Sequence, residues 1–226
     1  MEDNASCLRF AEGHSNVLRD YGVTKVTSAK NDWINNPDVY VVIVESPDGK
    51  ITYGGERIHV ANGVNPLPIE TAIGVVDAGI YDLVAKYVPG RTGELCGLWN
   101  SKAIAGHGIS VLLSKIGVAL SRRLQLGSLF VLCAPYTVAM TQMCGFEIET
   151  SIGNQGTFYY PKLDLIATSL MIKDVANIPT ADPEIKNEIL SYSSSGKLHT
   201  REKGPKGELD VELNLIIQKN VNVNNS

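Results

Sequence analysis

The segment from residue 95 to residue 134 constrains the fold more than any other part of the sequence. Apolar residues recur at helical spacing over Ile109–Leu124, with Ser114 and Lys115 on the opposite, solvent-facing side. Short apolar runs, LCGLW at 95–99 and SLFVLCA at 128–134, flank this helix. Two strands joined through a helix are typical of a crossover between parallel strands. The sequence therefore predicts one β–α–β unit in the middle of the chain.

Antiparallel strands are predicted on both sides of this unit. Residues 39–45 (VYVVIVE) and 51–60 (ITYGGERIHV) are strand-like, and the turn sequence Ser46-Pro47-Asp48-Gly49 joins them. Further strands are predicted over residues 146–149, 158–160 and 163–172, the first two joined as a hairpin through a glycine-rich turn. Further helices are predicted over residues 7–21, 71–87 and 137–143, and from Pro183. We therefore expect an α+β fold, with a mixed, mostly antiparallel sheet flanked by helices.

The chain is expected to divide into a main domain, residues 1–190, and a C-terminal extension, residues 191–226. Residues 191–207 are polar and predict a flexible loop, whereas Leu209–Ile217 alternate as LDVELNLII and predict a strand. The asparagine-rich end predicts a partly disordered tail.

Charge and cysteine usage exclude several classes of protein. The formal net charge of −4 gives no reason to expect nucleic-acid binding, which usually needs a basic face, although a small basic patch would not show in this total. The four cysteines form neither a Cys-x-x-Cys pair nor a Cys/His cluster, so we expect free thiols and no metal site. The first residues, MEDNASCLRF, are unlike a secretory signal, and no apolar stretch approaches the ~20 residues of a membrane span. We expect a cytoplasmic protein; its oligomeric state is not predicted.

Two glycines lie where the predicted loop 100–108 enters the predicted helix. Gly106 and Gly108 flank His107, and the N–H groups of a first helical turn are unpaired and carry partial positive charge. The segment is therefore a candidate cradle for a pyrophosphate. A P-loop is excluded because no Gly-Lys-Ser/Thr follows, and a dinucleotide fingerprint is excluded because Val111 stands at its third glycine position.

The order of elements and the loop residues together resemble the GNAT superfamily of acyltransferases. The loop motif of that family, Gln/Arg-x-x-Gly-x-Gly/Ala, matches at Gly106 and Gly108, but its first position holds Ala103. The resemblance covers about residues 5–173. It implies direct acyl transfer from a pantetheine thioester, acyl-CoA or acyl carrier protein, to a primary amine, with no permanently bound cofactor.

Four short motifs resemble one branch of that superfamily. They are Gly55-x-Arg57-x-His59, Leu67-Pro68-x-Glu70, Glu94-Leu95 and Gly145-Phe146. Similar motifs occur in N-acyl amino acid synthases and acyl-homoserine lactone synthases, which implies a small-molecule amine acceptor such as an amino acid. Arg57 and His59 are candidate substrate residues, since a guanidinium group holds a carboxylate well. Alternatively, Arg57 is a surface arginine and His59 is structural.

The resemblance also implies a donor site. Its candidate residues are Leu98, Trp99 and Asn100 for the pantetheine arm, and Ser101, Lys102, Gly106, His107 and Gly108 for the phosphates. The alternative for Leu98 and Trp99 is a place in the core, and a core strand can still present its backbone.

Two side chains are candidates for the proton transfers. Glu94, on one sheet face with Cys96 and Leu98, matches the position of the family's general base. Its alternative is a surface or ion-paired glutamate. The position of the family's tyrosine acid holds Thr141, which leaves nearby Tyr136 as the candidate acid. These departures support a competing function, a non-catalytic acyl-CoA-binding module with the same fold.

Overall fold

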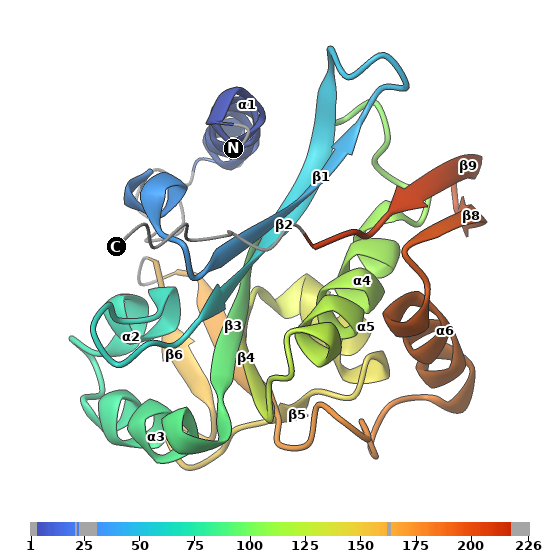
Figure 1. Ribbon diagram of the computed structural model, residues 1–226. Helices are drawn as coiled ribbons and strands as arrows, with labels where there is room; N and C mark the ends of the chain where they lie inside the picture. Colours follow the sequence, from blue (N-terminus) through green and yellow to red (C-terminus); the bar gives the residue numbers. More distant parts are fainter. Residues whose placement is uncertain (1–3, 21, 23–30, 162–163, 218–226) are drawn as a thin grey trace, which may run out of the picture.

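A seven-stranded sheet runs through the centre of the structure, a computed structural model that describes residues 4–20, 22, 31–161 and 164–217 (Figure 1). The strands lie in the order β1-β2-β3-β4-β7-β5, and β6 also pairs with β7. Their bounds are β1 (Val39–Glu45), β2 (Thr52–Val60), β3 (Thr92–Asn100), β4 (Ser128–Cys133), β5 (Glu147–Ile148), β6 (Thr157–Tyr159) and β7 (Ile166–Ile172). Among the strands of the described residues, only β3 and β4 pair in parallel. The predicted mixed, mostly antiparallel sheet is confirmed.

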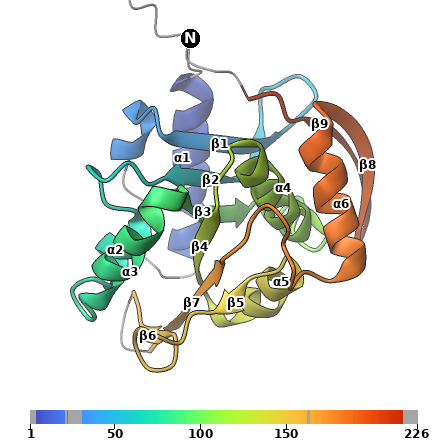
Figure 2. The same ribbon diagram turned by 60° about the horizontal axis from the view of Figure 1, so that its bottom comes forward.

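Helices cover both faces of this sheet (Figures 1 and 2). One face carries α1 (Asn4–Asp20), the 3₁₀ helix η2 (Asp32–Asn35), α2 (Pro68–Ile73) and α3 (Gly79–Tyr87), with η3 (Val88–Gly90) leading into β3. The other face carries α4 (Ile109–Arg123), α5 (Val138–Met143) and α6 (Pro183–Ser194), with η4 (Pro135–Thr137) following β4. The predicted crossover is confirmed as β3–α4–β4. Across the described residues, no helix is long and apolar enough to cross a bilayer.

Helix α4 is buried on more sides than its amphipathic pattern predicts. Leu112, Leu113 and Ile116 pack against the sheet as expected. Lys115, predicted to face solvent, is only 4% exposed. The reason is that α6 and the C-terminal strands cover the outer side of α4 (Figure 2).

The C-terminal extension is more ordered than predicted. The loop predicted over 191–207 is wrong: α6 continues to Ser194, across the predicted boundary, and Lys197–Gly204 is strand β8. Strand β8 pairs with the predicted strand, β9 (Gly207–Asn214), as an antiparallel hairpin. Most residues of β8 are polar or charged, and Arg201 pairs across the hairpin with Asp210 at 2.9 Å, so hydrophobic alternation does not reveal the strand. The tail predicted to be disordered, 218–226, lies outside the described residues.

Strands β5 and β6 do not form the predicted hairpin with each other. Both pair with β7, β5 at Leu170 and Met171 and β6 at residues 166–168. Because β7 is seven residues long, the two short strands share one of its edges. The start of the strand predicted from residue 163 lies outside the described residues, and β7 begins at Ile166.

A buried carboxyl group under α4 makes the stability of this fold sensitive to pH. Glu56 is 0% exposed, and its burial raises its pKa well above the ordinary value, which the Gly117 backbone N–H only partly offsets. Above about pH 4.3, where unfolded glutamates ionise, the unfolded chain therefore binds fewer protons than the folded one, so stability falls as pH rises.

We expect Glu56→Gln to remove this contribution. The free energy of unfolding of the variant should exceed that of the wild type by an amount that grows by at most about 1.4 kcal/mol per pH unit above pH 4.5. Urea denaturation between pH 4 and 9 measures the difference. A difference that stays constant with pH would show that Glu56 is ionised in the folded protein.

Candidate active site

Strands β3 and β4 diverge halfway along their length. They pair only between Thr92–Leu95 and Ser128–Val131, so the second half of β3, residues 96–100, pairs with β2 alone among the described residues. The backbone of Leu98, Trp99 and Asn100 thus borders a gap between two parallel strands. An extended amide-bearing chain, such as pantetheine, can pair with an open strand edge of this kind.

The side chains of this half-strand are part of the protein interior. Trp99 is 4% exposed and packs against Phe10 of α1. A bulge opposite Glu56 adds one residue to β3, so Leu98 packs into the core under α4 and does not share the face of Glu94 and Cys96 as predicted. The second half of β3 therefore buries its side chains in the core and still has an open backbone edge.

The loop after β3, residues 101–108, runs directly into α4. The Ser101 N–H donates to Tyr53 O at 2.6 Å, and the Asn100 side chain donates to Ser110 Oγ at 2.5 Å. Gly108 is the N-cap with a φ of +86°, and no side chain in the described part of the chain caps the helix. His107 Nδ1 lies 3.2 Å from Ile104 O, and Lys102 pairs with Asp20 at 2.8 Å. The first turn of α4 therefore keeps the features of an anion site.

The β8–β9 hairpin contacts this loop, which the sequence analysis missed. The Lys206 N–H donates to Gly106 O at 2.9 Å. A Cβ on Gly108 would lie 2.8 Å from Lys203 O, and one on Gly106 would lie 2.9 Å from the Lys206 side chain. Gly106 and Gly108 also have positive φ angles, +87° and +86°, so the backbone conformation and the close hairpin together favour glycine at these positions. The turn sequence Lys203-Gly204-Pro205-Lys206-Gly207 before the β9 alternation was the available signal for a hairpin.

On the opposite side of the sheet, strand register brings four chemically active side chains together. Arg57 and His59 are two residues apart on β2, and the neighbouring strand places Cys96 opposite Arg57 and Glu94 opposite His59. Arg57 is 0% exposed, so its alternative as a surface arginine is wrong. Its guanidinium group lies 4.5 Å from the ring of Trp33, a contact that the sequence did not indicate.

A cavity of about 410 Å³ opens beside this cluster. Its lining includes Asp32, Trp33, Arg57, His59, Asn65 and Thr71. His59 is only 9% exposed, yet its Nε2 atom has no hydrogen-bond partner among the described residues. The volume suits a small molecule, and polar or charged residues make up most of the lining, beside Trp33 and three prolines. Both predicted substrate residues therefore border one cavity.

Burial sets the protonation of the cluster. Burial raises the pKa of Glu94 to about 8, although the Ile69 N–H donates to its Oε2 at 2.7 Å and Arg57 lies near. Burial, with the charge of Arg57, lowers the pKa of His59 to about 3. Burial also raises the pKa of Cys96 to about 12. At neutral pH, His59 is neutral, Cys96 is a thiol and Glu94 can exchange its proton.

The predicted acid lies at the carboxyl end of β4. Tyr136 is on η4 and is 82% exposed, so its hydroxyl group is accessible from solvent. Thr141, at the position of the family's tyrosine, is buried and contacts Cys133 Sγ at 3.3 Å. Among the described residues, no group of three or more His, Cys, Asp or Glu side chains could share a metal ion.

No family model matches the chain, and no curated protein is significantly similar to it in sequence. Solved structures, however, share its fold. FeeM, an N-acyl amino acid synthase from uncultured soil microbes, is 14% identical with a TM-score of 0.58, over 79% of this chain and 94% of its own.

Two CoA-dependent acyl-homoserine lactone synthases are similar in the same way. MesI is 14% identical with a TM-score of 0.50, over 82% of this chain and 86% of its own. BjaI, solved with SAM and isopentyl-CoA, is 9% identical with a TM-score of 0.51, over 85% of this chain and 83% of its own. At such identities the likeness concerns the fold. The chain has the GNAT fold of these acyltransferases, with the β3–α4–β4 crossover at its centre.

Proposed function

We propose that this protein is an N-acyltransferase that moves an acyl group from a pantetheine thioester directly to the primary amine of a small molecule such as an amino acid. The observation that carries the proposal is the position of the diverging β3 and β4 strands. The N-terminus of α4, which no described side chain caps, lies at one end of the gap between the two strands. The cavity bordered by Arg57 and His59 lies on the opposite face of the sheet.

The donor would bind along the gap. The pantetheine amides would pair with the backbone of Leu98–Asn100, and the phosphates would lie at residues 101–108. Lys102 adds an exposed positive charge at this end. The same phosphopantetheine arm is present in acyl-CoA and in acyl carrier protein, so either donor fits this part of the site.

The acceptor would occupy the cavity. Arg57 gives the cavity wall a positive field, which adds to the effect of burial in lowering the pKa of His14 and of His59. This field favours an acceptor with a carboxylate. The neutral His59 Nε2 can accept a hydrogen bond from the acceptor amine, and Asp32 can attract the amine in its charged form.

The reaction then needs three proton transfers. Glu94 would remove a proton from the acceptor ammonium, directly or through one water, and the free amine would attack the thioester carbonyl. The new amide bond forms as the carbon–sulfur bond breaks, Tyr136 would donate a proton to the departing thiolate, and the nitrogen would lose its second proton to solvent, which leaves a neutral amide. Cys96 stays a thiol, as expected for direct transfer without an acyl-enzyme.

Calorimetric titration with acetyl-CoA, a long-chain acyl-CoA and free CoA tests the donor site, with acyl carrier protein as a parallel titrant. We expect micromolar binding of at least one donor. In transfer assays, kcat/KM should be about tenfold higher for an amino acid than for the same amino acid with its carboxylate converted to an amide. The reason is that the amide lacks the carboxylate that Arg57 attracts. Equal values for the two acceptors would remove Arg57 from the acceptor site.

The competing function is a non-catalytic acyl-CoA-binding module with the same fold. The buried Thr141 at the position of the family's tyrosine favours it, as does the absence of a basic residue at Ala103. Donor binding without turnover against a panel of amines would support the module over the enzyme.

A further inference from the structure

The tip of the β8–β9 hairpin lies over the loop that leads into α4. Pro205 and Lys206 form its turn, and the Lys206 N–H donates to Gly106 O at 2.9 Å. Gly204 packs directly on the loop. A Cβ at Gly204 would collide with Gly106 O and lie 2.7 Å from Gly108 N. The hairpin backbone therefore occupies the space next to the N–H group at the start of α4.

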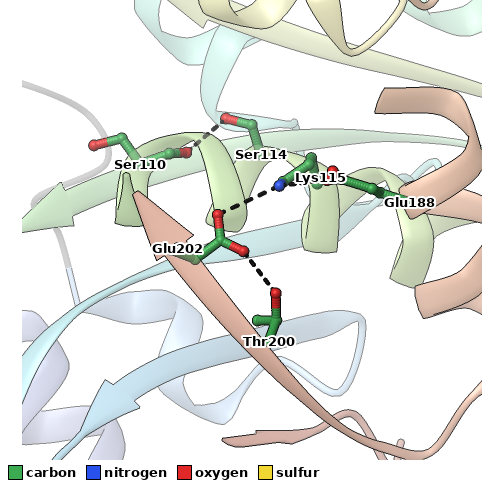
Figure 3. A network of polar contacts seen from close by, with 6 residues as sticks. All are labelled: Ser110, Ser114, Lys115, Glu188, Thr200 and Glu202. Carbon is green, nitrogen blue, oxygen red and sulfur yellow. Dashed lines mark hydrogen bonds and ion pairs between the residues drawn. The ribbon is translucent and has the colours of Figure 1, made fainter. Parts of the chain in front are cut away.

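A buried ion-pair network holds the hairpin in this position (Figure 3). Two residues before Gly204, the Glu202 carboxylate lies 3.4 Å from Lys115 Nζ of α4. Lys115 also binds Glu188 of α6 at 2.5 Å, and the Thr200 hydroxyl donates to Glu202 at 3.0 Å. At the far end of the hairpin, Leu213 is part of the main core. The hairpin is thus anchored at its base and along α4, and its tip rests on the loop.

We infer that the hairpin tip is an autoinhibitory cover of the donor site. The inference rests on the proposed function, because it takes residues 101–108 as the phosphate site. Phosphate oxygens need to approach the Gly108 N–H within hydrogen-bond distance, and Gly204 holds that space. Donor and tip compete, so the apparent dissociation constant equals the intrinsic one divided by the fraction of molecules with the tip lifted.

The variant Gly204→Ala tests this competition. Gly204 is outside the left-handed backbone region, so an alanine there is strained only by its collision with the loop. The methyl group should lift the tip and leave the loop unchanged. The matched control is Gly196→Ala in the same extension, where a Cβ would meet only Ile216, at an ordinary 3.6 Å.

Two measurements are made on each full-length protein. Hydrogen exchange of residues 203–207 reports whether the tip has lifted, and calorimetry with CoA and with holo acyl carrier protein reports donor binding. We expect faster exchange and about tenfold tighter donor binding in Gly204→Ala. We expect wild-type values for both measurements in Gly196→Ala.

Other results overturn the cover in distinguishable ways. Faster exchange with equal or weaker donor binding would mean that the tip does not compete with the donor, while the donor site stands. No binding of either donor to any variant, despite faster exchange, would overturn the proposed function and the cover together.

A second variant tests the same inference in case Gly204→Ala does not fold. Glu202→Gln keeps the side-chain shape and removes the charge that pairs with Lys115. It should also speed exchange at 203–207 and tighten donor binding. Unchanged exchange in both variants would show that these contacts do not hold the tip, and would overturn the cover.

Discussion

Replacement of Glu94 by glutamine is expected to lower kcat by at least about a hundredfold, because the variant lacks the base that takes the acceptor proton. The wild-type rate should rise with pH and level off above about pH 8, since burial raises the Glu94 pKa to about 8 and only the carboxylate accepts a proton. The variant should lack this rising limb. Steady-state transfer assays between pH 6 and 10 measure both effects.

Glu70→Gln is the matched control for this experiment. Glu70 is a neighbouring carboxylate whose Oε2 accepts the Leu67 N–H at 2.6 Å, and its charge contributes to the raised pKa of Glu94. The control should keep the rising limb and move it to lower pH. Glu94 would lose its role as base if Glu94→Gln retained the wild-type rate at every pH.

Loss of the buried lysine in α4 is the largest expected effect on stability. Lys115→Met should reduce the free energy of unfolding by about 3 kcal/mol, because it leaves the 9% exposed Glu202 side chain without its cation. Glu188, at 44% exposure, can turn toward water and limits the loss. Urea denaturation at pH 7 measures the change.

Two further variants show whether the ion pair causes this loss. The double variant Lys115→Met with Glu202→Gln should recover most of the stability, because the carboxylate left without its cation is removed as well. Lys50→Met removes an exposed pair with Asp48, at 3.1 Å, and should change stability by less than about 0.5 kcal/mol. A double variant no more stable than Lys115→Met would show that the loss does not come from leaving Glu202 without its cation.

Local patterns predicted the central part of the fold. The apolar run of residues 39–45, the helical spacing over Ile109–Leu124 and the run at 128–134 all formed the expected elements. These segments carry their own periodicity, because one side of each packs on a core. The buried position of Lys115 was not predictable in this way, since it depends on α6 and β8, which are more than 60 residues away.

The candidate site was predictable in part for the same reason. Arg57, His59 and Glu94 were singled out by resemblance, and the register of β2 against β3 makes them neighbours. Trp33 and the hairpin tip were missed, because both reach the site through tertiary packing that no local pattern encodes. The charged residues of β8 also hid a strand, since they interrupt the alternation of apolar residues that predicts one.

The position of β9 has a consequence for how the chain folds during synthesis. Leu213 and Leu215 are part of the same core as α4, and the Arg123 guanidinium group donates to Leu215 O. A nascent chain released only as far as α6 still exposes the part of α4 that the C-terminal hairpin covers. The core therefore closes only after residue 215 has left the ribosome, and until then the apolar surface that β9 covers is open to chaperones or to other unfinished chains.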